Sequence, residues 1–63
     1  MSDINVDREK CILGALDGLE RSRVSFKLWF DNAKSQTERN AVDQLLRKVE
    51  EMIRLTSNFS RIG

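Results

Sequence analysis

The sequence predicts an all-α protein: an antiparallel two-helix hairpin, which we expect to dimerise into a four-helix bundle. Two segments, residues 5–32 and 36–58, carry apolar side chains in alternating steps of four and three, the heptad period of packed helices. A short polar stretch at residues 33–35 separates them. The 63-residue chain has no Pro, is 40% hydrophobic and is 33% charged. These observations together predict one small helical domain over residues 1–63.

The first predicted helix begins near Asn5 and carries one seam of apolar side chains. Asn5 is the expected N-cap, and Asp7 and Glu9 follow it in the first turn, where carboxylates suit the positive end of the helix dipole. Ser2 or Asp3 would serve as an earlier start. Arg23 is the one charged residue in the middle of this seam. The residues that this helix is expected to place in the hairpin core are Ile12, Leu16, Leu19, Phe26 and Phe30.

The second predicted helix begins at a capping motif. Ser35 and Glu38 match the capping box Ser-x-x-Glu, in which the two side chains bond to each other's backbone N–H groups. Because no Gly or Pro enforces the break, one long bent helix is the alternative. The residues that the second helix is expected to place in the hairpin core are Val42, Leu45, Val49, Met52 and Phe59.

The two seams stay in register when the chain is folded about residue 35 or 36. Phe30 then lies opposite Val42, and Ile12 lies opposite Phe59, so the numbers of each pair add up to 71 or 72. Helices joined by a short loop are usually antiparallel neighbours. The register therefore supports a hairpin along the whole length of both segments.

The first helix carries more apolar surface than one seam can cover. Several apolar residues of this helix lie away from the seam. A row of small residues, which starts at Cys11 and ends at Trp29, lies on a different side of the helix. A second copy related by a two-fold axis could bring the same face of this helix against itself. We therefore expect a homodimer, or a different protein partner on this face. The candidate face consists of Leu13, Gly14, Gly18, Ser22, Val24, Leu28 and Trp29.

Arg23 allows three interpretations. Its stem can lie along the seam while its guanidinium reaches water. It can form a structural ion pair with an acid such as Glu50, or it can bind an anionic ligand. The sequence leaves all three open.

The composition excludes several kinds of chemistry. The chain has no His and a single cysteine, Cys11, which argues against a zinc site, histidine-based catalysis and a disulfide framework. The paired carboxylates Glu50 and Glu51 are adjacent, so on a helix they point about 100° apart. We therefore expect no enzymatic activity, no cofactor and no metal.

The expected function is a non-catalytic interaction or regulatory module that works through helix–helix contacts and self-association. The alternative is a small nucleic-acid-binding regulator that uses basic residues on the outer face of the second helix, although acidic residues interleave with them and weaken any attraction for phosphate. Neither a membrane-spanning run nor a signal peptide is expected, so the expected location is the cytoplasm. The basic residues are Arg39, Arg47, Lys48 and Arg54.

Overall fold

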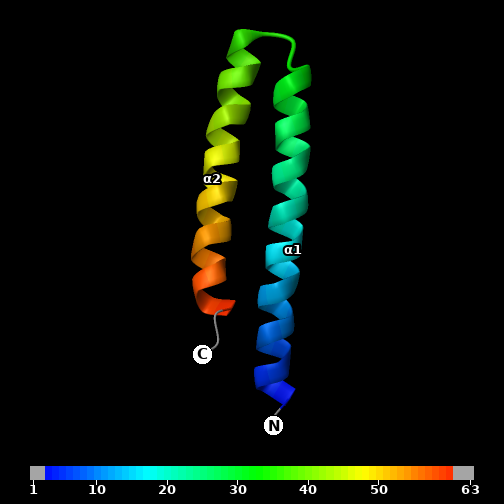
Figure 1. Ribbon diagram of the computed structural model, residues 1–63, viewed down its shortest axis with the longest axis vertical. Coiled ribbons are helices and arrows are strands. Elements are labelled where there is room, and N and C mark those ends of the chain that lie inside the picture. Colours follow the sequence, from blue (N-terminus) through cyan, green and yellow to red (C-terminus); the bar gives the residue numbers. More distant parts are fainter. Residues whose placement is uncertain (1–2, 61–63) are drawn as a thin grey trace.

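The computed structural model describes residues 3–60, which form two antiparallel helices joined by a tight turn (Figure 1). Helix α1 spans Asp3–Asn32 and helix α2 spans Gln36–Ser60. The chain is a thin rod, with Cα extents of 51 × 15 × 14 Å. The expected two-helix hairpin is confirmed, and the alternative of one long bent helix is wrong.

Both helices are longer than the sequence pattern indicates. Helix α1 starts at Asp3, so Asn5 lies inside the helix and the prediction of Asn5 as its N-cap is wrong. The earlier start at Asp3, the alternative to Asn5, agrees with the bounds of α1, and Ser2 lies outside the described residues. At the other end, the Ser60 hydroxyl donates a hydrogen bond to the Ser57 carbonyl at 3.0 Å, in the last turn of α2.

The two helices contact each other along one seam. In α1 the seam contains the residues that the sequence predicted, together with Arg23, and all of them are partly buried. Ala33 continues the seam into the turn. Among the described residues, the buried hydrophobic side chains are Ala33, Val42 and Val49, and Val42 is fully buried. The α2 side of the seam consists of Val42, Leu46, Val49, Ile53, Thr56 and Ser60.

Three residues predicted for the hairpin core lie outside it. Leu45, Met52 and Phe59 are 38%, 45% and 63% exposed. The apolar stripe of α2 is wider than a single neighbouring helix can cover. Helix α1 packs on the side of Leu46 and Ile53, each one position after a predicted core residue, so their predecessors are left at the surface.

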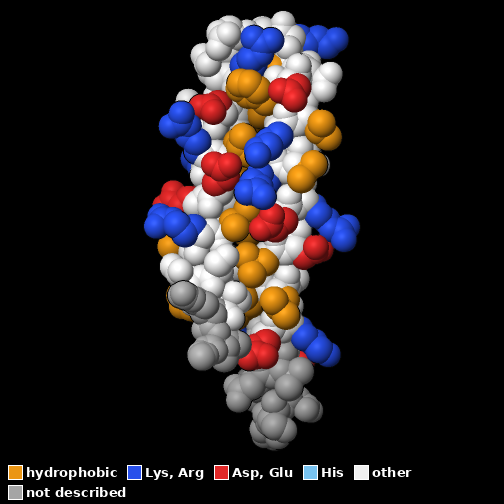
Figure 2. Space-filling model, viewed as in Figure 1, with side chains coloured by type: hydrophobic (Ala, Val, Ile, Leu, Met, Phe, Trp, Pro, Cys, Tyr) orange, Lys and Arg blue, Asp and Glu red, His pale blue; other side chains and the backbone are white. Residues whose placement is uncertain are grey.

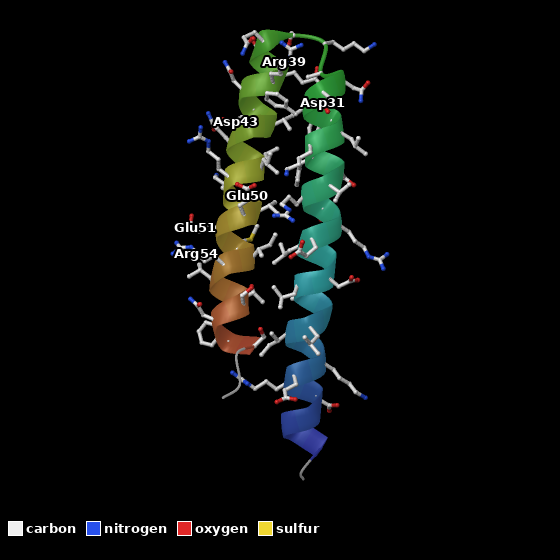
Figure 3. The ribbon with its side chains drawn as sticks, in the orientation of Figure 1. Asp31, Arg39, Asp43, Glu50, Glu51 and Arg54 are labelled. Atoms are coloured by element: carbon white, nitrogen blue, oxygen red, sulfur yellow. The ribbon has the colours of Figure 1, made fainter. Side chains whose placement is uncertain are left out.

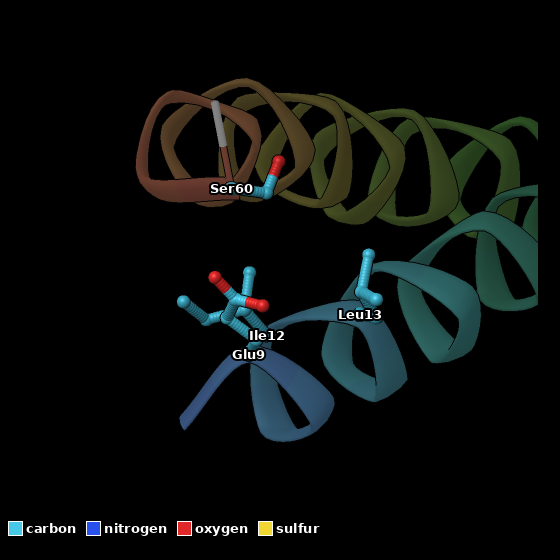
Figure 4. A pocket seen from close by; sticks show the side chains of 4 residues that line it. All are labelled: Glu9, Ile12, Leu13 and Ser60. Carbon is cyan, nitrogen blue, oxygen red and sulfur yellow. The ribbon is translucent and has the colours of Figure 1, made fainter. Parts of the chain in front are cut away.

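The two helices end at different levels. Helix α1 continues past the last described turn of α2 (Figure 1). A small hollow opens at this end, and it is lined by Glu9, Ile12, Leu13 and Ser60 (Figure 4). Ile12 therefore lies level with residues 59 and 60, which agrees with the register expected from the sequence.

Candidate interaction faces

The seam divides the surface of the hairpin into two broad faces. Both helices turn by about 100° per residue in the same hand but run in opposite directions. Residues one position before a seam residue therefore lie on one face of the hairpin, whichever helix they belong to. Residues one position after a seam residue lie on the other face.

The face formed by the residues after the seam is charged. Figure 2 shows Lys, Arg, Asp and Glu side chains interleaved on it, with hydrophobic side chains visible between the helices and over α1. Two exposed apolar residues of α1 also lie one position after a seam residue, namely Leu13 and Val24. Asp43, Glu50 and Arg54 of α2 lie one position after a seam residue, and Figure 3 labels them in the same orientation. Arg47 donates to Asp43 at 3.1 Å on this face. Opposite charges in alternation favour a solvated surface.

Arg23 pairs with its own helix. Its Nη2 lies 3.1 Å from Glu20 Oε1, and the two side chains are 37% and 51% exposed. Of the three interpretations, the structure shows an Arg whose stem lies in the seam and whose guanidinium reaches a partly exposed carboxylate. The acid that pairs with Arg23 is Glu20, one helical turn away on α1, and not Glu50, which the ion-pair interpretation named as an example.

The opposite face carries large apolar side chains from α2. Leu45, Met52, Leu55 and Phe59 are all exposed, and Lys48 interrupts them. The full set, here named the exposed α2 row, is Ala41, Leu45, Lys48, Met52, Leu55 and Phe59. Leu55 is not among the residues predicted from the sequence. Its spacing of three from Met52 and four from Phe59 is the signal that could have found it.

On the same face, α1 presents small side chains. This set, here named the small row, is Cys11, Ala15, Gly18, Ser22 and Ser25, and Trp29 ends it. A Cβ atom added at Gly14 or Gly18 would meet nothing within 4 Å. Glycine costs about 0.8–1.0 kcal/mol relative to alanine inside a helix. Packing within the hairpin therefore does not require glycine at either position.

The two rows lie side by side. Cys11 of the small row shares a shallow depression with Leu55 and Phe59 of the exposed α2 row. By contrast, Leu13, Val24 and Leu28 are more than half exposed on other sides of α1. The face predicted from the sequence is therefore divided: Gly18, Ser22 and Trp29 lie beside α2, while those three apolar residues do not. Gly14 lies at the outer edge of the small row.

Hydrogen bonds at the turn involve Trp29, the last residue of the small row. The Glu38 N–H donates to Ser35 Oγ at 3.1 Å, the bond expected of an N-cap. The carboxylate of Glu38 instead accepts from the Trp29 indole at 2.6 Å and from the Lys34 N–H at 3.2 Å. These two bonds, the indole bond first, hold the pKa of Glu38 below its ordinary value of 4.5, against a weaker opposing effect of burial. Trp29 also stacks on Phe26, with ring centroids 6.0 Å apart.

The basic residues of α2 do not form one patch. Arg47 and Arg54 lie on the charged face, and Lys48 lies in the exposed α2 row on the opposite face. Arg39 is partly buried next to the turn, and Arg47 is already bound to Asp43. Their positions give no concentrated surface for a phosphate backbone.

Neither described helix combines the length and the apolarity that a membrane span requires. Comparison of the chain with protein-family models, curated proteins and solved structures gives no match.

Proposed function

We propose that this protein is a non-catalytic interaction module that acts through helix–helix contacts and self-association, as a homodimer with the form of a four-helix bundle. The observation that carries the proposal is the apolar surface that the hairpin leaves uncovered. Eight large hydrophobic side chains are between 38% and 63% exposed, while the buried hydrophobic residues of the described part of the chain are Ala33, Val42 and Val49.

The energetics favour covering this surface. Fully burying a Leu, Phe or Met side chain stabilises a protein by about 1.5–3 kcal/mol relative to leaving it exposed. Leu45, Met52, Leu55 and Phe59 together would therefore contribute several kcal/mol if a partner covered them. Small domains rarely have more than about 3–5 kcal/mol of stability, and without disulfides or metals oligomerisation is a common remedy.

Light scattering across a concentration series tests the proposal. The expected result is a mass that rises from that of one 7.3 kDa chain to twice that value, with a melting temperature that increases with concentration. Arg47→Glu on the charged face is the control, since it should leave the association constant within about threefold. A folded monomer at hundreds of micromolar would overturn the proposal.

A further inference from the structure

We propose that a second copy of this chain covers the face formed by the small row and the exposed α2 row, with its two-fold axis parallel to the helices, so that both turns lie at the same end. The small row of each copy then packs on the exposed α2 row of the other. This inference rests on the proposed self-association and specifies its geometry, which differs from the contact of the first helix with itself that the sequence suggested.

The side chains of the small row and of the exposed α2 row match in size. Within one chain, residues of the two rows lie level when their numbers add up to about 70, as Cys11 and Phe59 do in their shared depression. A two-fold axis parallel to the helices preserves these levels. Gly18 then faces Met52 of the second copy, and near the turn the sizes are reversed, because Trp29 faces Ala41. A large side chain meets a small one at both levels.

A perpendicular two-fold axis, with the turns at opposite ends, gives a poorer match. An axis at the level of Gly18 would place Gly18 on Gly18 and Met52 on Met52. The two α1 helices would then need a close approach while the two α2 helices needed a wide one. The parallel axis gives both α1–α2 contacts the same spacing, within the usual 8–10 Å of packed helices.

The area of the face formed by the two rows, and the charges around it, also bear on the dimer. Each row extends over 18 residue steps, which is about 27 Å, and two packed helices are about 20 Å wide. The copies would together bury on the order of 1,100 Å², above the roughly 1,000 Å² expected of a biological interface. At the outer edge, Arg21, which already pairs with Asp17 at 3.1 Å, comes level with Glu51 of the second copy. Lys48, the one charged residue of the exposed α2 row, comes level with Ser22 of the second copy.

Spin labels at the turn distinguish the two axes. The variant combines Cys11→Ser with Lys34→Cys, so that each chain carries one label on the exposed Lys34 position. The proposed dimer holds the two labels within about 30 Å, because the turns are neighbours. Opposite turns would separate them by about 48 Å, since Lys34 lies 16 residues beyond Gly18.

Mixing two variants tests the size match directly. Gly18→Leu has open space within its own hairpin, so its hairpin should fold, and any loss of association reports on the contact between copies. In the proposed dimer, Gly18→Leu chains and Met52→Ala chains complement each other, because the enlarged side chain at position 18 of one copy faces the shortened side chain at position 52 of the other. Native mass spectrometry of the mixture should show the heterodimer about tenfold above the statistical 1:2:1 ratio. Circular dichroism of each variant alone checks its helical content.

The outcomes separate this inference from the proposed function. A short label distance with an enriched heterodimer supports the parallel axis. A dimer with labels about 48 Å apart, or with a statistical mixture, overturns the axis and leaves self-association standing. A monomer at all concentrations overturns both.

Discussion

At the scale of single residues, Glu38 connects the turn to the face formed by the small row and the exposed α2 row. Its carboxylate accepts hydrogen bonds from the Trp29 indole and from the Lys34 backbone, while its own N–H binds Ser35. Trp29 ends the small row, so these bonds hold the last large side chain of that face against the turn. The side chain of a capping residue thereby positions a residue of the candidate interface.

Because the pKa of Glu38 is lowered in the folded protein, we expect the stability of the hairpin to depend on pH in the acid range. A carboxyl group whose pKa is lower in the folded than in the unfolded state stabilises the fold above the unfolded pKa, and this stabilisation disappears as the pH falls through the folded pKa. We expect Glu38→Gln to lower the melting temperature at pH 7, and this difference to shrink as the pH falls below 4.5 and through the lowered pKa of Glu38. Fluorescence of Trp29, the only tryptophan, should change over the same acid range. Glu51→Gln, at an exposed carboxylate on the same helix, is the control, and an equal effect of both substitutions would contradict the assignment.

Arg23 occupies a seam position without a fully buried partner. Exposed ion pairs such as its contact with Glu20 contribute only about 0–1 kcal/mol, and an apolar residue in the seam would gain buried area. We expect Arg23→Leu to raise the free energy of unfolding by about 1 kcal/mol in urea denaturation. A loss above about 2 kcal/mol would show instead that the guanidinium is fully satisfied in the seam.

At the scale of the helices, the sequence predicts α1 better than α2. The α1 seam is apolar at every step except Arg23, and adjacent large apolar residues occur only near its two ends, at Ile12–Leu13 and in the run of residues 28–30. In α2 the adjacent pairs Leu45–Leu46 and Met52–Ile53 satisfy the same period on two neighbouring sides. Local pattern cannot decide which member of each pair faces α1, because that choice depends on how the two helices pack. The Glu38–Trp29 bond escaped prediction for the same reason, since it joins residues of different helices.

The start of α2, by contrast, is fixed locally by Ser35. Its hydroxyl accepts the Glu38 N–H, one of the backbone donors that have no partner at a helix start. We expect Ser35→Ala to cost about 1 kcal/mol of unfolding free energy, measured by thermal or urea denaturation. Ser57→Ala in α2, outside both rows, is the matched control and should be neutral or slightly stabilising. An equally small effect of both substitutions would contradict the capping role of Ser35.

At the scale of the whole molecule, the hairpin has two faces of opposite character. The face with Asp43, Glu50 and Arg54 is suited to water because its opposite charges alternate. The other face places small residues of α1 beside large ones of α2. This asymmetry follows from the sequence, since most residues after a seam position are charged and most residues before one are small or apolar; Leu13, Val24 and Lys48 are among the exceptions. We therefore expect the first face to stay in contact with water and the second face to be covered by a partner.

The last prediction compares two exposed leucines on different sides of the rod. Leu45 belongs to the exposed α2 row, and Leu28 lies on α1 away from that face. A charge at position 45 would be placed in the contact of both copies, where losing a buried Leu costs about 1.5–3 kcal/mol at each of two symmetric sites. We therefore expect Leu45→Glu to raise the dissociation constant at least about 100-fold, and Leu28→Glu to change it less than about threefold. Analytical ultracentrifugation measures both constants, and circular dichroism of the dilute variants shows whether each hairpin remains folded. A larger effect at position 28 would move the contact to the outer side of α1 and exclude the small row from it.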